Sequence, residues 1–193
     1  MFFSAPCGFG KTAVAQALLE GRRVWKLEGE SARGADLQTK KDWEILLMED
    51  FQLFQEEEDK QTLCALIRRS PGKRFVILSR GSPPGCLMAF QYAGLMTVIG
   101  PKDLLFDRED IRHFFDASGI PVTDGEIAGI LKESIGYPLG VAITAQNMSS
   151  GARFSQQIVG RSFQEVYRYF ETAIYLRLDL PYRRFLLELS PFE

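Results

Sequence analysis

The chain has 193 residues, of which 46% are hydrophobic and 25% are charged, and its formal net charge is -2. This length suits one domain with an appendage, and the composition is that of a globular protein rather than a disordered or fibrous one. The slightly acidic balance excludes a strongly basic nucleic-acid-binding chain, and no run approaches the roughly 18 apolar residues of a membrane helix.

The first feature predicted along the chain is a phosphate-binding loop between a strand and a helix. The segment Ala5 to Thr12, of sequence Ala-Pro-Cys-Gly-Phe-Gly-Lys-Thr, follows the apolar start Met1 to Phe3. A run of helix formers, Ala13 to Leu19, comes next and ends near Gly21, a residue suited to the position after a helix. A helix that begins directly after a glycine-rich loop binds anions through its free N–H groups and its dipole.

The residue types of this loop match the chemistry of nucleotide phosphates. Gly8 and Gly10 allow the backbone to curl so that successive N–H groups point inward. Lys11 can reach the β- and γ-phosphates, and the Thr12 hydroxyl can bind Mg²⁺. Ala5 stands where such loops usually have their first glycine. The loop therefore predicts a site for a nucleotide with Mg²⁺.

Four short runs that follow predict further strands, and an intervening segment predicts a helix. Trp43 to Met48 has the continuous apolar character of a strand buried on both faces. Glu56 to Arg69 begins with acids and ends with bases, as the helix dipole favours. Strands that alternate with helices predict a parallel sheet covered on both faces. The predicted strands are Arg23–Leu27, Trp43–Met48, Arg74–Arg80 and Leu95–Ile99, with a loop over Glu28–Asp42 and a break over Gly81–Gly85.

From Pro101 onward the pattern predicts helices only. Two capping boxes are expected to open helices, one formed by Thr123 with Glu126 and the other by Ser162 with Glu165. The other predicted helices are Arg108–Ser118, one from Pro138 to about Met148, and an amphipathic turn or two at Tyr182–Ser190, with a linker at Ser149–Gly151. Both chain ends look cut, so we expect a segment of a longer protein.

The number and spacing of the cysteines indicate the cellular compartment of the protein. Cys7, Cys64 and Cys86 are odd in number and widely spaced, which is not the pattern of a disulfide framework. Free thiols in a reducing cytoplasm are the simpler expectation.

Two acidic residues and one arginine are candidates for the chemistry around the phosphates. Glu49 and Asp50 follow the apolar strand Trp43 to Met48, where one carboxylate can hold Mg²⁺ through water and the other can orient an attacking water. Arg80 ends the next predicted strand at the same edge of the sheet, within reach of a γ-phosphate. These placements predict a site that distinguishes a triphosphate from a diphosphate.

Four motifs in this order carry a family resemblance: Ser4–Thr12, Leu46–Phe51, Ile77–Arg80 with Pro83 and Pro84, and Gly136–Gly140. Together they resemble the nucleotide-binding domain of STAND-type signalling NTPases, specifically that of the large LuxR-type transcription regulators similar to the bacterial maltose activator. The resemblance covers nearly the whole chain.

The resemblance implies an α/β fold with three parts. These are a parallel-sheet P-loop NTPase core of the AAA+/STAND type over residues 1–100, a helical lid over 101–150, and a helical segment over 151–193 that leads into a truncated winged-helix domain. In that family bound ADP holds a closed monomer, and ATP with an inducer releases an assembling form. The implied partners are adenine nucleotide, the other domains of the full-length protein and further copies of it, with no direct DNA contact by this segment and no membrane.

The resemblance also assigns roles to residues. Glu49 and Asp50 take the Mg²⁺ and water-orienting positions, with Thr12 as a second Mg²⁺ ligand. Glu49 is one methylene longer than the usual aspartate, so we expect at most a slow regulatory ATPase. The nucleotide-binding positions are Gly8, Phe9, Gly10, Lys11, Thr12, Ala13, the γ-phosphate sensor Arg80 and the lid residue Pro138, which lies near the base in the family.

Two other interpretations stay open. The chain could be a P-loop enzyme, an ATPase or kinase with real turnover, although the sequence shows no substrate site for a kinase. It could also be a degenerate interaction module whose loop holds no nucleotide. Nucleotide binding separates the third interpretation from the first two, and steady-state phosphate release separates a switch from an enzyme.

Overall fold

The computed structural model describes residues 1–38, 42–149 and 155–189. The chain divides into two compact units, Met1–Leu105 and Phe106–Glu193. Ser149, the first residue of the predicted linker Ser149–Gly151, is described and ends a helix. The other two linker residues and part of the predicted loop from Glu28 to Asp42 lie outside the described residues. Among the described residues, no helix has the length and apolar character needed to cross a membrane.

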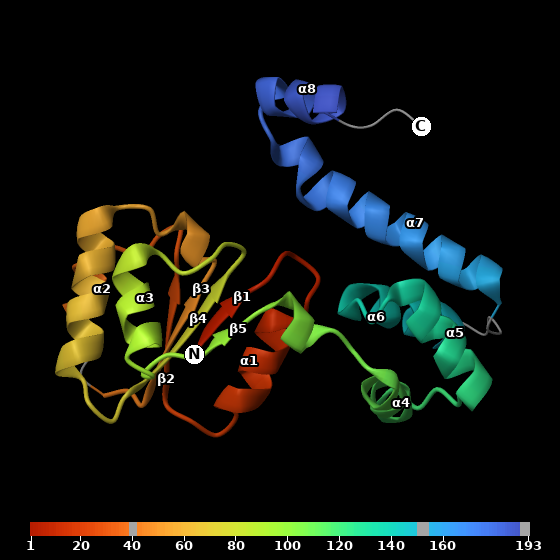
Figure 1. Cartoon of the computed structure of the whole chain (residues 1–193), viewed down its shortest axis with the longest axis horizontal. Coiled ribbons are helices and arrows are strands. Elements are labelled where there is room, and N and C mark those ends of the chain that lie inside the picture. The colour runs from red at the N-terminus through yellow and green to blue at the C-terminus, as the bar shows by residue number, and fades with distance from the viewer. Residues whose placement is uncertain (39–41, 150–154, 190–193) are drawn as a thin grey trace. The chain divides into compact units, whose positions relative to one another are not determined.

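The first unit is built on a parallel sheet of five strands in the order β2-β3-β4-β1-β5 (Figure 1). β4 therefore lies between β1, which leads into the glycine-rich loop, and β3, which leads into the acidic pair. The strands are β1 (Phe2–Ser4), β2 (Val24–Glu28), β3 (Ile45–Glu49), β4 (Arg74–Ser79) and β5 (Val98–Ile99). The predicted parallel α/β fold is confirmed.

Helices cover both faces of this sheet because its strands are apolar on both sides. On one face α1 (Lys11–Leu19) packs against alternate strand residues such as Phe3 and Leu47. On the other face α2 (Glu57–Arg69) and α3 (Gly85–Tyr92) enclose a core that includes Phe2 and Met48. Short 3-10 turns complete the unit at Asp36–Gln38, Phe51–Leu53 and Pro101–Leu104.

Two predictions for this unit need correction. The sequence pattern placed only a break and a strand after β4, whereas the structure has helix α3 there. The break residues Pro83 and Pro84 stand just ahead of this helix, where a missing N–H costs no hydrogen bond. The predicted strand Leu95–Ile99 is shorter, because the N–H groups of Leu95 and Met96 donate to the carbonyl of Phe90 at the end of α3.

The second unit is helical, as predicted. Its core is formed by apolar residues of three consecutive helices, among them Phe115, Ile127 and Val141. The helices are α4 (Arg108–Ala117), α5 (Asp124–Ser134), α6 (Pro138–Ser149), α7 (Gln156–Ala173) and α8 (Leu180–Leu189), with a 3-10 turn at Tyr175–Arg177.

The two predicted capping boxes differ in outcome. Thr123 caps α5: its hydroxyl accepts from the N–H of Glu126, whose carboxylate accepts from the Thr123 N–H at 2.7 Å. The second box is wrong, because Ser162 and Glu165 lie inside α7. Their side chains instead accept hydrogen bonds from the amide of Asn147 on α6. The same sequence pattern therefore caps the start of α5 at Thr123, whereas at Ser162 and Glu165 it links α7 to α6.

We predict that Thr123→Ala lowers the free energy of unfolding by about 1 kcal/mol, because it removes a helix cap. Chemical denaturation measures this change. Thr123→Ser keeps the hydroxyl and is expected to retain most of the stability. Equal losses in the two variants would contradict a capping role.

Candidate functional site

The segment between β1 and α1 has the backbone of an anion-binding loop. Gly8 and Gly10 have φ of 81° and 74°, a left-handed conformation that favours glycine. Gly10 is the N-cap of α1, and neither a side-chain cap nor an acidic residue occupies the first turn. The first N–H groups of the helix are therefore not satisfied by side-chain capping within the helix, and a bound anion can accept from them.

Lys11 lies folded back onto this loop. Its ammonium group donates hydrogen bonds to the carbonyl of Ala5 at 2.6 Å and to that of Pro6 at 2.8 Å. Burial lowers the pKa of Lys11 below the ordinary lysine value. Because its present acceptors are neutral carbonyls, an anionic acceptor at the loop would gain a strong charge-assisted bond.

Ala5 is accommodated at the position where such loops usually have glycine. Its φ is not positive, so an alanine is unstrained there. The side chain is buried in the core beside Phe3, and its N–H donates to the carbonyl of Ser79 at 3.2 Å. This bond joins the start of the loop to the end of β4.

Glu49 is the last residue of β3 and lies in line with Ile45 and Leu47, which pack on the α1 face of the sheet. Its side chain is only 13% exposed. One carboxylate oxygen, Oε2, lies 2.6 Å from the ammonium of Lys26 on β2. The other oxygen, Oε1, is buried and, within the described part of the chain, has no hydrogen-bond partner.

This carboxylate suits Mg²⁺, which binds proteins through one or two oxygen ligands and keeps several waters. The free Oε1 of Glu49 and the hydroxyl of Thr12, in the first turn of α1, are the oxygens that would hold it. The described residues contain no cluster of three or more acidic, histidine or cysteine side chains around a common point. Lys26 competes for the same carboxylate, and its pKa is raised by the hydrogen bond to Glu49.

Asp50 and Arg80 are brought together at the carboxyl ends of β3 and β4. Asp50 has a left-handed backbone with φ of 45°, which turns the chain out of the sheet. Its Oδ1 lies 3.7 Å from the guanidinium of Arg80. The pKa of Lys11 responds first to burial and to Cys7, and to a smaller extent to the charges of Arg80 and Asp50.

Gln52 is a site residue that sequence reasoning missed. Its amide nitrogen donates to Oδ1 of Asp50 at 2.7 Å, and its amide oxygen accepts from the backbone N–H of Arg80 at 3.0 Å. A lone glutamine two residues after an acidic pair carries no recognisable signal. Only the left-handed turn at Asp50 brings it beside β4.

The remaining predicted residues are placed as follows. Phe9 is half-buried against the core on the α1 face, and Ala13 is exposed on α1. Pro138 is buried at the start of α6 in the second unit. Two residues before Pro138, the backbone of Gly136 lies close to that of Phe106. A Cβ on Gly136 would lie 2.3 Å from the carbonyl oxygen of Phe106, so this position requires glycine. A role for Pro138 near a nucleotide base stays a prediction.

Comparison with known proteins identifies the fold. No family model matches the chain, and no curated protein matches it either. Among solved structures it resembles RuvB of Thermotoga maritima, with 14% identity over 84% of this chain and 60% of that one and a TM-score of 0.55. It also resembles a STAND protein, a signal transduction ATPase with a tetratricopeptide repeat sensor, from Pyrococcus horikoshii, with 15% identity over 99% of this chain and 35% of that one and a TM-score of 0.57.

A third similar structure is the ORC1 protein of Aeropyrum pernix in complex with DNA, with 12% identity over 97% of this chain and 65% of that one and a TM-score of 0.56. The chain thus spans less than two thirds of the length of each of these three proteins. At such low identity the likeness concerns the fold. The chain has the fold of a P-loop ATPase domain, followed by a helical part.

We predict that Gly29→Ala destabilises the acidic end of β3. A Cβ on Gly29 would lie 2.3 Å from the backbone oxygen of Asp50, so the strand ends must move apart. The expected loss is about 2 kcal/mol in the free energy of unfolding, a typical cost of overpacking. Gly81→Ala is the control, since no atom lies within 4 Å of the Cβ that it adds. Equal stability of the two variants in chemical denaturation would contradict this close approach.

Proposed function

We propose that the chain is the adenine-nucleotide-binding switch domain of a signal-responsive transcription regulator of the large LuxR type. Its ADP or ATP state would control assembly of the full-length protein, with slow or no hydrolysis. In this proposal residues 1–100 bind the phosphates, residues 101–150 form a lid, and residues 151–193 lead into a winged-helix domain. The P-loop ATPase fold and the STAND protein among the similar structures support it.

The glycine-rich loop carries the proposal. It combines two left-handed glycines, a helix start without side-chain cap, and a half-buried lysine whose present partners are carbonyls of the loop itself. A polyphosphate offers more acceptors than those carbonyls do. Lys11 would exchange them for phosphate oxygens, while the N–H groups at the start of α1 bind the same group.

Arg80 is proposed to distinguish ATP from ADP. Its guanidinium lies 3.7 Å from Oδ1 of Asp50. A γ-phosphate carries more negative charge than one carboxylate and would attract Arg80 away from it. A nucleotide changes the conformation only by binding one state more tightly than another, and this exchange of partners supplies such a difference.

The acidic residues favour slow or no hydrolysis. Lys26 holds one oxygen of Glu49, and Gln52 and Arg80 engage Oδ1 of Asp50. Oδ1 of Asp50 would have to leave its partners before it could orient water. Lys26 would compete with Mg²⁺ for the Glu49 carboxylate, of which only Oε1 has no hydrogen-bond partner among the described residues. An ATPase with real turnover stays the alternative, and steady-state phosphate release by the purified chain separates the two.

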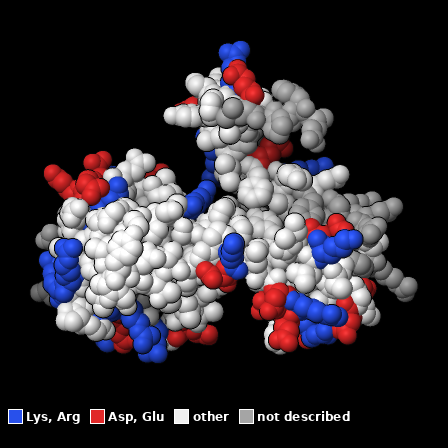
Figure 2. All heavy atoms as spheres, viewed as in Figure 1, with Lys and Arg blue, Asp and Glu red and all other residues white. Residues whose placement is uncertain are grey.

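In the proposal this segment makes no direct contact with DNA. Among the described residues on the face shown in Figure 2, acidic and basic side chains are interspersed. Proteins that bind DNA through their phosphates usually gather lysine and arginine on one surface. In the proposal the DNA-binding part therefore belongs to another domain.

We predict that ADP and ATP bind the chain and that Lys11→Ala abolishes binding, because it removes the only side-chain cation within the loop. Isothermal titration calorimetry measures the heat, and thermal melting provides a second measurement. A nucleotide at 100 times its Kd is expected to stabilise the fold by about 2.7 kcal/mol. Lys132→Ala, at an exposed position of α5, is the control. A wild-type chain that binds no nucleotide would leave only the interaction-module interpretation.

A second prediction concerns the pKa of Lys11. Burial lowers this pKa, and the negative charge of bound ADP is expected to raise it, since opposite charge stabilises the ammonium form. NMR titration of the lysine side chains with and without ADP follows this change. A Lys11 resonance whose titration is unaffected by saturating ADP would show that the lysine does not contact the phosphates.

A further inference from the structure

Three charged side chains meet where β2 and β3 approach their carboxyl ends. The ammonium group of Lys26 lies 2.6 Å from Oε2 of Glu49 on β3 and 3.1 Å from Oε1 of Glu28 on β2. One lysine is therefore shared by two carboxylates. Two carboxylates and one ammonium group leave an excess of negative charge, so this cluster can accept a further cation.

The register of the two strands explains why the carboxylates lie close together. Glu28 is the direct partner of Glu49 in the ladder, and Lys26 is the partner of Leu47. Because side chains alternate along a strand, Lys26 and Glu28 lie on the same face of β2. Like charges that stand opposite each other destabilise a sheet. Lys26 offsets the repulsion, since its ammonium group contacts both carboxylates.

The two carboxylates differ in their surroundings. Glu49 is 13% exposed, and its neighbours on the same face of β3, Ile45 and Leu47, pack in the core. Glu28 is half-exposed. A charge removed from water is costly unless it is paired, so Glu49 needs a cation more than Glu28 does. The shorter of the two distances from Lys26 is accordingly the one to Glu49.

The two oxygens of Glu49 have different functions in the proposed nucleotide site. Oε2 holds Lys26, whereas Oε1 is buried, has no hydrogen-bond partner among the described residues and is the oxygen that would bind Mg²⁺. Two cations on one carboxylate repel each other. Lys26 can withdraw, because its flexible four-carbon stem is half-exposed and Glu28 is already within reach of its ammonium group.

We propose that Lys26 is a movable counter-ion that sets the affinity of the nucleotide site for Mg²⁺, with Glu28 as its alternative partner. In the metal-free site Lys26 neutralises Glu49. When Glu49 binds Mg²⁺, Lys26 withdraws from it and stays paired with Glu28. The inference rests on the proposed function, because the metal would bind together with the nucleotide phosphates.

The test measures how much Mg²⁺ improves the binding of ADP to the full chain. Isothermal titration calorimetry gives the Kd of ADP in excess EDTA and in excess Mg²⁺, and the ratio of the first Kd to the second is called the metal gain. Lys26→Met keeps an apolar stem and removes the charge that competes with the metal. It is expected to raise the metal gain about tenfold, the scale on which groups that contact a metal ligand act.

Glu28→Gln is expected to change the metal gain in the opposite direction. It removes the alternative partner of Lys26, so the ammonium group stays on Glu49 and the metal gain falls. Opposite effects of two neutralising substitutions cannot come from a general loss of folding. Lys132→Met is the matched control, because it removes the same charge from an exposed residue of α5. The Mg²⁺ bound by free ADP is the same for every variant and cancels in the comparison.

The double variant Lys26→Met with Glu28→Gln separates two ways in which Glu28 could act. If Glu28 acts through Lys26, the double variant has the metal gain of Lys26→Met alone, since residues in one network are not additive. If Glu28→Gln lowers the metal gain as much in the double variant as it does alone, Glu28 attracts the metal directly. That result would overturn its role as the alternative partner.

Two further outcomes distinguish this inference from the proposed function. A chain that binds ADP in EDTA, but whose metal gain is the same in wild type, Lys26→Met and Lys132→Met, keeps its nucleotide site. In that case Lys26 forms a merely structural ion pair, and the inference is overturned. A wild-type chain that binds ADP in neither buffer overturns both the proposed function and the inference.

Discussion

The placement of β4 between β1 and β3 is the constraint on which the site depends. β1 leads into the glycine-rich loop and β3 leads into the acidic pair, so the intervening strand sets the distance between that loop and the carboxylates. Neighbouring strands in a sheet lie about 4.8 Å apart, which puts β1 and β3 about 10 Å from each other. Arg80, at the end of β4, is thereby placed between them. The hydrogen bond from Ala5 to Ser79 fixes this arrangement at the point where the loop begins.

Each charged group of the site is balanced by another part of the protein. Lys11 is bonded to loop carbonyls, Arg80 lies near Asp50, and Glu49 is paired with Lys26. In the proposed function a phosphate would bind by exchanging partners rather than by neutralising isolated charges. Such an exchange would link ligand binding to small movements of the strand ends. The free oxygen of Glu49 is the exception among the described residues and gives this edge of the sheet its remaining capacity for a cation.

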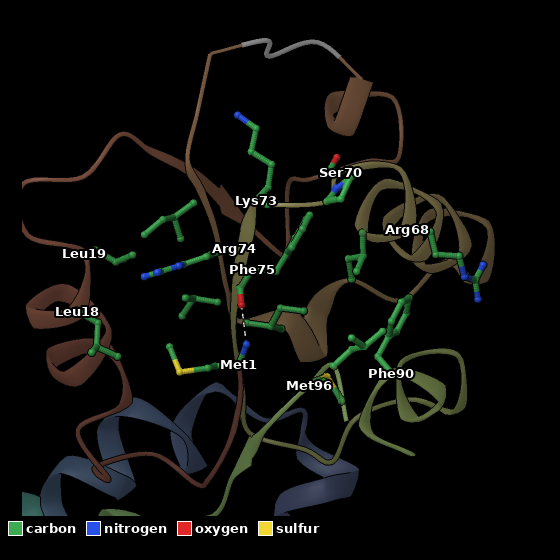
Figure 3. A pocket seen from close by; sticks show the side chains of 17 residues that line it. Met1, Leu18, Leu19, Arg68, Ser70, Lys73, Arg74, Phe75, Phe90 and Met96 are labelled. Atoms are coloured by element: carbon green, nitrogen blue, oxygen red, sulfur yellow. Dashed lines mark hydrogen bonds between the residues drawn. The ribbon is translucent and has the colours of Figure 1, made fainter. Parts of the chain in front are cut away.

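The two ends of the sheet differ in polarity. At the carboxyl ends the backbone turns sharply, with left-handed residues at Gly8, Gly10 and Asp50, and polar groups converge there. At the amino ends of the strands, apolar side chains of α1, α2 and α3 line a cavity of about 600 Å³ (Figure 3).

Much of the architecture followed from the sequence alone. The apolar run before Glu49, the loop from Ala5 to Thr12 and the cap at Thr123 were recognisable because each depends on contacts between near neighbours in the chain. Only the tertiary structure decided the strand order, the ion pair of Lys26 with Glu49, the contacts of Gln52 and the cavity at the amino ends of the strands. Ser162 and Glu165 show the reason. A local pattern states which bonds a segment can make, whereas packing against a distant element, here Asn147 on α6, decides which bonds it does make.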